Sequence, residues 1–167
     1  QAAIDKVPEN NKKRFTVLIK AGTYNEQIKI PASKPFVSLI GENPADTKLT
    51  FKNSSKDAGS TSGSFAFYVG GHDFYAENIT FENSYGTGSQ AVAVLAEADR
   101  AIFKNCRFLG WQDTLYAKRG RQYYRDCYVE GHVDFIFGQA ISFESSSKQS
   151  SLRSSFKPLA MTPTALV

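Results

Sequence analysis

Four side chains in the second half of the sequence combine acid and amide chemistry at a regular spacing. Gln90, the pair Gln112–Asp113 and Asp134 stand in apolar, strand-like runs, 22 residues from Gln90 to Gln112 and 21 from Asp113 to Asp134. Two carboxylates held close together cannot both ionise easily, so one takes up a proton near neutral pH. The ionised one can attack a carbonyl carbon, and the protonated one can protonate a leaving group. The amides can donate hydrogen bonds to an oxyanion.

This spacing brings the four groups together only if the chain winds once per step, and a second set of columns predicts that it does. The segments 74–81, 101–108 and 122–129 align, with apolar and polar side chains alternating as in a strand that buries one face. The aligned columns are Glu77, Lys104, Arg125; Asn78, Asn105, Asp126; Ile79, Cys106, Cys127; and Phe81, Phe108, Val129. Repeats of this length predict a solenoid, here an all-β parallel β-helix. An antiparallel sandwich with accidental periodicity is the alternative.

Other interpretations of the polar positions stay open at this stage. The four side chains could be stacked polar ladders or turn caps with a purely structural role. Two aspartates and two amides alone make a poor calcium site, because Ca²⁺ takes roughly six to eight oxygen ligands. No Ser-His-Asp arrangement competes, since His72 and His132 are the only histidines and the sequence has no Gly-x-Ser-x-Gly motif.

Length and composition indicate one globular domain. The chain has 167 residues, 41% of them hydrophobic, and no apolar run approaches the roughly 20 residues of a membrane span. The net charge of +4 tolerates an anionic partner, but the basic residues are scattered and form no nucleic-acid module. We therefore expect neither a nucleic-acid nor a membrane partner. The sequence contains no segment typical of a signal peptide, and we expect Gln1 to lie in mid-domain.

The two cysteines allow two interpretations. Cys106 and Cys127 are 21 residues apart in one repeat column, and neighbouring coils of a β-helix are about 4.8 Å apart, within reach of a disulfide. A disulfide would imply an oxidising compartment, whereas a stacked pair of buried thiols would not. Asn53 and Asn78 each begin a glycosylation acceptor triplet. Asn78 also belongs to a repeat column, where it could instead form a ladder.

The order of elements follows from the alternation and the turn residues. Short strands are expected at 15–20, 27–30, 36–40, 48–51 and 65–69. Residues 1–13 should form a helix end or a loop, 21–24 a turn, and 53–64 a surface loop. No sustained 3.6-residue period is present, so helix content should be low.

The pattern changes at the C-terminal side. Phe143 is expected in the aromatic column and Glu144 in the charged one, after which apolar residues no longer recur at the repeat positions. Residues 145–167 begin with a serine-rich run whose composition cannot bury enough surface to order itself. The sequence therefore predicts a β-helix domain at 1–144, incomplete at its C-terminal end, and an irregular tail at 145–167.

Four short segments resemble signatures of the pectin methylesterase (pectinesterase) family, in the family's order. They are GTYNE at 22–26, QAVAV at 90–94, QDTLY at 112–116 and DFIFG at 134–138, the last three also at the family's spacing. The likeness extends over roughly residues 2–144 and is nearest to the plant enzymes. It implies a right-handed parallel β-helix, in agreement with the repeat analysis. It also implies a disulfide between Cys106 and Cys127.

The resemblance further implies a function and residue roles. The family hydrolyses methyl esters of pectin, so Asp134 is similar to its nucleophile and Asp113 to its general acid and base. Gln90 and Gln112 are similar to the oxyanion stabilisers, and Tyr116 and Phe137 are candidates for contacts with sugar rings, although packing also explains them. No cofactor or metal is implied. The expected partners are methyl-esterified homogalacturonan and a proteinaceous pectinesterase inhibitor, and the expected location is secreted, in the cell wall.

One departure from the family bears on activity. The family's next signature, Leu-Gly-Arg-Pro-Trp, supplies an arginine that pairs with the nucleophile, and the sequence does not contain it; Arg153 in the serine-rich tail is no replacement. We therefore expect a truncated form of the family domain, either an esterase or a catalytically inactive homologue that only binds pectin or a protein. A pectate lyase or polygalacturonase β-helix is a third alternative, against which QDTLY and DFIFG argue.

Overall fold

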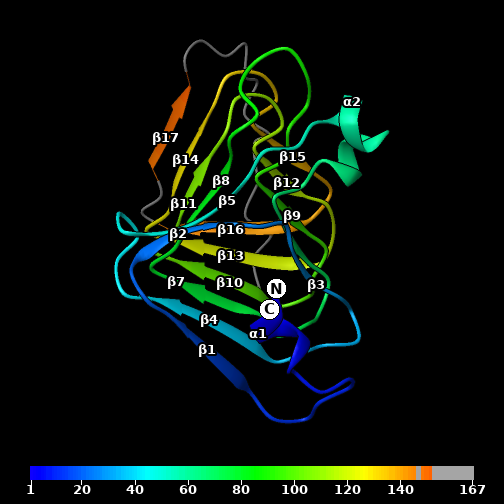
Figure 1. Ribbon diagram of the computed structural model, residues 1–167, viewed down its shortest axis with the longest axis vertical. Helices are drawn as coiled ribbons and strands as arrows, with labels where there is room; N and C mark the ends of the chain where they lie inside the picture. The colour runs from blue at the N-terminus through cyan, green and yellow to red at the C-terminus, as the bar shows by residue number, and fades with distance from the viewer. Residues whose placement is uncertain (146–147, 152–167) are drawn as a thin grey trace, which may run out of the picture.

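The chain winds into a parallel β-helix whose coils each contribute one strand to each of three sheets (Figure 1). The computed structural model describes residues 1–145 and 148–151. Within these residues, sheet A has six parallel strands, namely β1 (Phe15–Ile19), β4 (Val37–Gly41), β7 (Tyr75–Glu77), β10 (Ala101–Lys104), β13 (Arg121–Arg125) and β16 (Ile141–Ser145). The expected all-β, right-handed parallel β-helix is confirmed.

The other two sheets complete each coil. Sheet B contains, in the part of the chain that the structure describes, β2 (Gly22–Asn25), β5 (Thr47–Phe51), β8 (Thr80–Asn83), β11 (Arg107–Leu109), β14 (Tyr128–Gly131) and β17 (Lys148–Ser151). Sheet C contains, in the same part, β3 (Ile28–Ile30), β6 (Phe67–Val69), β9 (Val94–Ala96), β12 (Leu115–Ala117) and β15 (Ile136–Gly138). Every pairing between these strands is parallel, so equivalent residues of successive coils lie side by side.

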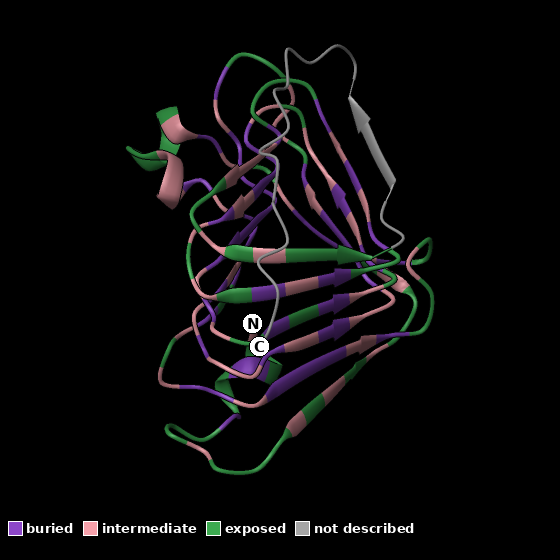
Figure 2. Cartoon of the chain, turned by 180° about the vertical axis from the view of Figure 1, so that it is seen from behind, coloured by how far each residue is buried: buried purple, intermediate pink, exposed green. Residues whose placement is uncertain are grey.

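The predicted columns are the columns of the structure. Phe81 pairs with Phe108 and Phe108 with Val129 along sheet B, and all three are buried. The rings of Phe81 and Phe108 stack with centroids 5.8 Å apart, and those of Phe103 and Tyr124 with centroids 5.2 Å apart. Buried residues recur along the strands of the middle coils, whereas β1 and β16 are more exposed (Figure 2). The core is therefore a stack of coil layers held together by apolar burial.

The column of Asn78, Asn105 and Asp126 makes the corner between sheets A and B. All three have left-handed backbones, with φ of 59°, 48° and 53°, a conformation that asparagine and aspartate tolerate better than other residues with a Cβ. The Nδ2 of Asn105 donates a hydrogen bond of 2.7 Å to Oδ1 of Asn78. The side chain of Asn78 thus belongs to a polar ladder.

Two expectations about local structure need correction. The stretch 21–24 is no turn, because Gly22–Asn25 forms β2 and pairs with β5. The loop at 53–64 contains a helical turn, α2 (Ser55–Ala58), and a 3₁₀ turn, η1 (Thr61–Gly63), each begun by a serine cap. The first residues form the short helix α1 (Ala2–Asp5), one of the two alternatives given for them.

The last coil differs from the expected one by a single position. Phe143 pairs with Tyr123 and Glu144 with Tyr124, so Phe143 lies on the outer face, 61% exposed, and Glu144 continues the column of Phe103. A slip of one residue exchanges the two faces of a strand. In addition, the backbone of β17 pairs with β14, so sheet B extends into the stretch expected to be irregular. Residues 146–147 and 152–167 lie outside the described residues.

Candidate active site

Asp113 and Asp134 occupy the same place in successive coils. Asp113 stands two residues before β12 and Asp134 two residues before β15, and Leu115 of β12 pairs with Ile136 of β15. Both aspartates have left-handed backbones, with φ of 66° and 45°. The N–H of Asp113 donates to the carbonyl of Val133 at 3.1 Å. Asn78, Asn105 and Asp126 have the same conformation, so it shows that the two aspartates occupy equivalent turns and does not by itself mark a functional site.

The two carboxyls differ in their surroundings. Asp113 is only 6% exposed, whereas Asp134 is exposed. Burial raises the pKa of Asp113 to about 6, and the negative charge of Asp134 adds to the rise. The two groups are therefore close enough to interact electrostatically. Asp113 can stay protonated at pH values well above the ordinary pKa of an aspartate.

Gln112 immediately precedes Asp113, and Gln90 belongs to the preceding coil. The N–H of Ala91 donates to the carbonyl of Gln112, which brings the backbone of Gln90 beside that of Gln112. Further along, the N–H groups of Ala93 and Val94 both donate to the carbonyl of Thr114, at 2.9 and 3.1 Å. Two residues of one coil thus oppose one residue of the next, which is a β-bulge. The extra residue accounts for a step of 22 rather than 21 between the glutamines.

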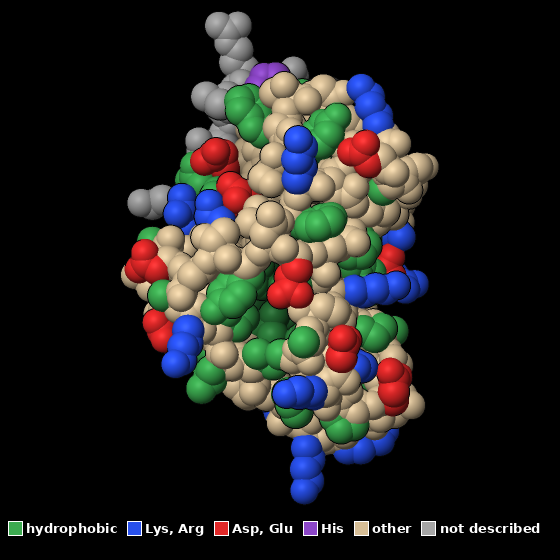
Figure 3. Space-filling view, in the orientation of Figure 1, with side chains coloured by type: hydrophobic (Ala, Val, Ile, Leu, Met, Phe, Trp, Pro, Cys, Tyr) green, Lys and Arg blue, Asp and Glu red, His purple; other side chains and the backbone are tan. Residues whose placement is uncertain are grey.

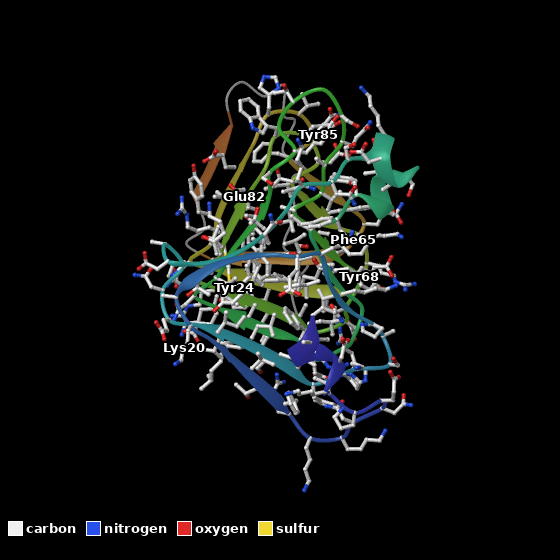
Figure 4. The ribbon with its side chains drawn as sticks, in the orientation of Figure 1. Lys20, Tyr24, Phe65, Tyr68, Glu82 and Tyr85 are labelled. Atoms are coloured by element: carbon white, nitrogen blue, oxygen red, sulfur yellow. The ribbon has the colours of Figure 1, made fainter. Side chains whose placement is uncertain are left out.

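An outward-facing row of sheet C continues from the aspartates along the strands. Tyr116 pairs with Phe137, and their rings stack with centroids 4.1 Å apart at 19°. Tyr68 and Leu95 occupy the same position of β6 and β9. Figure 4 shows Tyr68 close to Phe65, and the two ring centroids are 5.5 Å apart. Leu95 is buried, whereas Tyr68, Tyr116 and Phe137 are half-buried, and aromatic rings of this kind pack against a sugar ring or a neighbouring side chain.

A charged cluster that the sequence analysis missed lies beside this row. The carboxylate of Glu97 forms ion pairs with Lys118 at 2.6 Å and Arg119 at 2.8 Å, and accepts a hydrogen bond from Tyr68 at 3.3 Å. Burial works against ionisation, but the two cations outweigh it, so the pKa of Glu97 lies below its ordinary value. Its residues come from three coils and share no motif, so only the one-coil spacing of Glu97 and Lys118 could have suggested it.

A second missed contact involves the loop before Phe65. The hydroxyl of Ser55, at the start of α2, donates a hydrogen bond of 2.6 Å to Oε1 of Gln90. The N–H of Ser55 donates to the carbonyl of Gln90 at 2.8 Å. Figure 1 shows α2 beside the strands of sheet C. The contact joins residues 35 positions apart outside the repeat columns, so no periodic signal in the sequence predicts it.

The expected disulfide is absent from the structure. Cys106 and Cys127 are buried free thiols in successive coils, which is the second of the two interpretations given above. The Sγ of Cys127 lies 3.4 Å from the carbonyl oxygen of Phe103, and that of Cys106 lies 3.3 Å from the carbonyl oxygen of Lys104. Burial raises the pKa of the Cys106 thiol, so it stays protonated. An oxidised form remains a prediction of the family resemblance alone.

The described residues include an apolar hollow that is not at the aspartates. It has a volume of about 440 Å³ and lies between α1 and the first coils, lined by Ile4, Val17, Tyr24, Leu39 and Leu49 among others (Figure 3). Asp113 and Asp134 belong to later coils, so this hollow is not part of their site. Residues 1–145 and 148–151 contain no cluster of three or more His, Cys, Asp or Glu side chains that could hold a metal ion. They also contain no helix long and apolar enough to cross a membrane.

The fold and this site define a parallel β-helix protein with a pair of carboxyls on one of its sheets. Residues 1–157 match the family model described as Pectinesterase. Pectinesterase 31 of Arabidopsis thaliana is 48% identical over 151 residues, which cover 84% of this chain and 48% of that protein. A pectinesterase of Petunia integrifolia is 50% identical over 137 residues, which cover 81% of this chain and 37% of that protein. The chain belongs to the pectinesterase family.

Solved structures agree with this assignment. Pectin methylesterase from carrot superposes with a TM-score of 0.88 at 33% identity, over 90% of this chain and 47% of that one. A pectin methylesterase in complex with a hexasaccharide superposes with a TM-score of 0.82 at 29% identity, over 95% of this chain and 52% of that one. The chain therefore spans about half the length of these relatives or less.

Proposed function

We propose that this chain hydrolyses methyl esters of pectin, releasing methanol, with Asp134 as nucleophile and Asp113 as acid and base. The observation that carries the proposal is the pairing of an exposed carboxyl with a buried one whose pKa is raised to about 6. Two carboxyls in unequal surroundings are the arrangement that divides nucleophile from general acid. The names of the relatives, all pectinesterases or pectin methylesterases, supply the substrate class.

In the first step, the carboxylate of Asp134 attacks the carbonyl carbon of a methyl-esterified galacturonate. The carbonyl oxygen becomes an oxyanion, and the amide groups of Gln90 and Gln112 donate hydrogen bonds to it. When the tetrahedral intermediate collapses, its C–O bond to the methoxy group breaks. The protonated Asp113 gives its proton to the departing oxygen, and methanol leaves. The product is an anhydride between Asp134 and the galacturonate.

In the second step, Asp113 acts as a base. Its carboxylate takes a proton from water, and the hydroxide so formed attacks the anhydride at its galacturonate carbonyl. The bond to Asp134 breaks, and Asp134 leaves as a carboxylate while Asp113 keeps the proton from water, so both aspartates regain their starting protonation states. The product leaves as galacturonic acid, which gives its carboxyl proton to the solvent. All atoms and protons balance without a cofactor or metal.

The outward row of sheet C provides the surface for the polymer. Tyr116 and Phe137 present stacked rings three residues beyond Asp113 and Asp134, so a galacturonate chain can rest there while one ester reaches the carboxyls. The solved complex of a relative with a hexasaccharide supports an oligosaccharide on this fold. We extend the proposal to location and partners: the protein is secreted and acts in the cell wall, and a pectinesterase inhibitor protein binds it.

The test is methanol release from methyl-esterified homogalacturonan, compared between the chain and Asp134→Asn. We expect release from the former and only background from the latter, because an amide is a poor nucleophile. Binding of each to the same polymer is measured in parallel and should be equal. Release at background from both would refute the proposal, and retained binding in that case would support the homologue that only binds pectin.

A further inference from the structure

The side-chain amide of Gln90 is held by a hydroxyl group from another part of the chain. Ser55 donates from Oγ to Oε1 of Gln90 at 2.6 Å, and the backbone N–H of Ser55 donates to the Gln90 carbonyl at 2.8 Å. The Oγ atoms of Ser55 and Ser89 are also 2.8 Å apart. Since the one proton of Ser55 goes to Gln90, the hydroxyl of Ser89 donates to Ser55.

We infer that Ser55 is a positioning residue, whose hydroxyl fixes the Gln90 amide so that its Nε2 atom faces the reacting ester. This inference rests on the proposed function and adds a residue that neither the family signatures nor the repeat pattern indicates. Ser55 itself touches no reacting atom in this account. It acts through Gln90.

The orientation of the amide matters because its two ends have opposite roles. Oε1 accepts hydrogen bonds and Nε2 donates them, and only a donor stabilises a developing oxyanion. A hydroxyl that donates to Oε1 turns the carbonyl end toward α2 and leaves Nε2 to donate at the site. Without that hydroxyl, an amide rotated by half a turn would present a lone pair to the oxyanion, which repels it.

The start of α2 is built to hold Ser55 in place. Ser54 is fully buried and caps the helical turn: its Oγ accepts from the N–H of Asp57 at 3.2 Å and donates to the Asp57 carboxylate at 2.6 Å. The turn ends at Gly59, whose left-handed φ of 74° is the usual way to finish a helix. The position of Ser55 is therefore fixed by its own helical turn, not only by its contact with Gln90.

The buried side-chain amide of Asn83 forms hydrogen bonds both to the loop that carries Ser55 and to the segment that carries Gln90. Asn83 is 2% exposed, and its Nδ2 donates to the carbonyl of Ser64, at the end of the loop, and to that of Val92, just after Gln90, at 2.9 and 3.0 Å. Its Oδ1 accepts from the N–H of Asn53, just before α2, at 3.3 Å. The segments that carry Ser55 and Gln90 are thus held in fixed relation, as a preorganised oxyanion donor requires.

The experiment compares kinetic constants for methanol release from methyl-esterified homogalacturonan. Ser55→Ala should lower kcat about tenfold with KM changed less than twofold, because the lost orientation matters mainly in the transition state. Ser55→Thr keeps the hydroxyl and should stay within about threefold of the parent. Ser60→Ala is the same change in the same loop; it removes the cap of η1 but no contact to Gln90, so it should leave kcat and KM unchanged. In a Gln90→Ala background, Ser55→Ala should cause no further loss.

Two outcomes would overturn the inference while leaving the proposed function intact. One is a Ser55→Ala rate equal to that of Ser60→Ala. The other is a tenfold loss that persists in the Gln90→Ala background, which would mean that Ser55 acts independently of Gln90. An inactive parent chain would instead count against the proposed function.

A measurement that needs no turnover tests the orientation itself. The side-chain ¹⁵N resonance of Gln90 is assigned by its disappearance in Gln90→Ala. In Ser55→Ala this resonance should move and its heteronuclear NOE should fall, since the amide gains mobility, while in Ser60→Ala both should match the parent. An unchanged resonance in Ser55→Ala would overturn the inference whether or not the chain is active.

Discussion

Asp113 and Asp134 are the same residue type in the same turn of successive coils, yet the fold gives them different properties. Asp113 is buried, and desolvation disfavours its charged form, with the charge of Asp134 as a second cause. Asp134 is exposed, so water can solvate its carboxylate. Because the two surroundings differ, one group can hold a proton while the other remains available as a nucleophile.

The raised pKa of Asp113 has a consequence for stability. The folded state binds the proton more tightly than the unfolded state, whose aspartate has a pKa of about 3.9, so stability should fall as the pH rises from about 4 to about 6. Asp113→Asn cannot ionise and should remove this loss, for a gain of up to about 3 kcal/mol at pH 7 and little gain below pH 4. Urea unfolding of both proteins across this pH range measures the difference. A gain that does not vary with pH would contradict the raised pKa.

The same pKa should govern the first chemical step. Formation of the anhydride requires protonated Asp113, so the rate of the methanol burst should fall roughly tenfold per pH unit above about pH 6. Rapid-quench measurement of the first turnover at several pH values shows this dependence. A burst rate that stays constant between pH 6 and 8 would show that Asp113 is not the acid.

At the scale of elements, the corners of the coils depend on residues that accept a left-handed backbone. Asn78, Asn105 and Asp126 form one such corner, and Asp113 and Asp134 form another, so the same local conformation serves both the frame and the site. Asparagine and aspartate suit it because their short polar side chains can bond locally. At the first corner the bond also runs between coils, from Asn105 to Asn78.

Replacing Asn105 separates backbone strain from the loss of the ladder bond. Asn105→Val places a β-branched residue at a φ of 48° and should destabilise the fold by about 1–3 kcal/mol. Asn105→Gly loses the same hydrogen bond without the strain and should cost about 1 kcal/mol or less. Urea midpoints with unchanged m-values report both. Equal losses for the two variants would show that the ladder bond, not the corner conformation, is what matters there.

At the scale of the molecule, stability comes from buried aromatic rings that contact one another between neighbouring coils. Phe81, Phe103, Phe108 and Tyr124 lie within stacking or edge contact of one another across three coils. Each ring fills space that belongs to two neighbouring layers. Removing one should therefore disturb the coils on both sides of it.

Phe108 lies at the centre of this stack and is completely buried. Phe108→Ala should lower the free energy of unfolding by about 3–5 kcal/mol, through lost burial and the cavity left behind. Leu18→Ala is the matched control, since Leu18 is a large apolar residue that is 77% exposed, and it should cost about 0.5 kcal/mol or less. Similar losses for both variants would mean that the ring stack does not support the coils.

The periodic part of the molecule could be predicted from the sequence, and the rest could not. The step of 21 residues places Asp113 beside Asp134, and the alternating columns align Phe81 with Phe108, although these two are 27 residues apart. The sequence pattern places the last coil one residue out of register because the inward positions of that coil are polar, so Phe143 is expected in the core but lies outside. The contact of Ser55 with Gln90 joins a loop to a strand end 35 residues away. Such contacts depend on how the loop folds, which no repeat in the sequence records.

The central claim is that winding of the chain brings Asp113 and Asp134 into one site, and titration of Asp113 tests it most directly. With ¹³C-labelled aspartate, NMR can follow its carboxyl in the parent chain and in Asp134→Asn, whether or not the chain is active. We predict a pKa of about 6 in the parent, and a lower value in the variant that still exceeds that of a free aspartate, because burial is the larger cause. An ordinary aspartate pKa that is the same in both proteins would contradict the account.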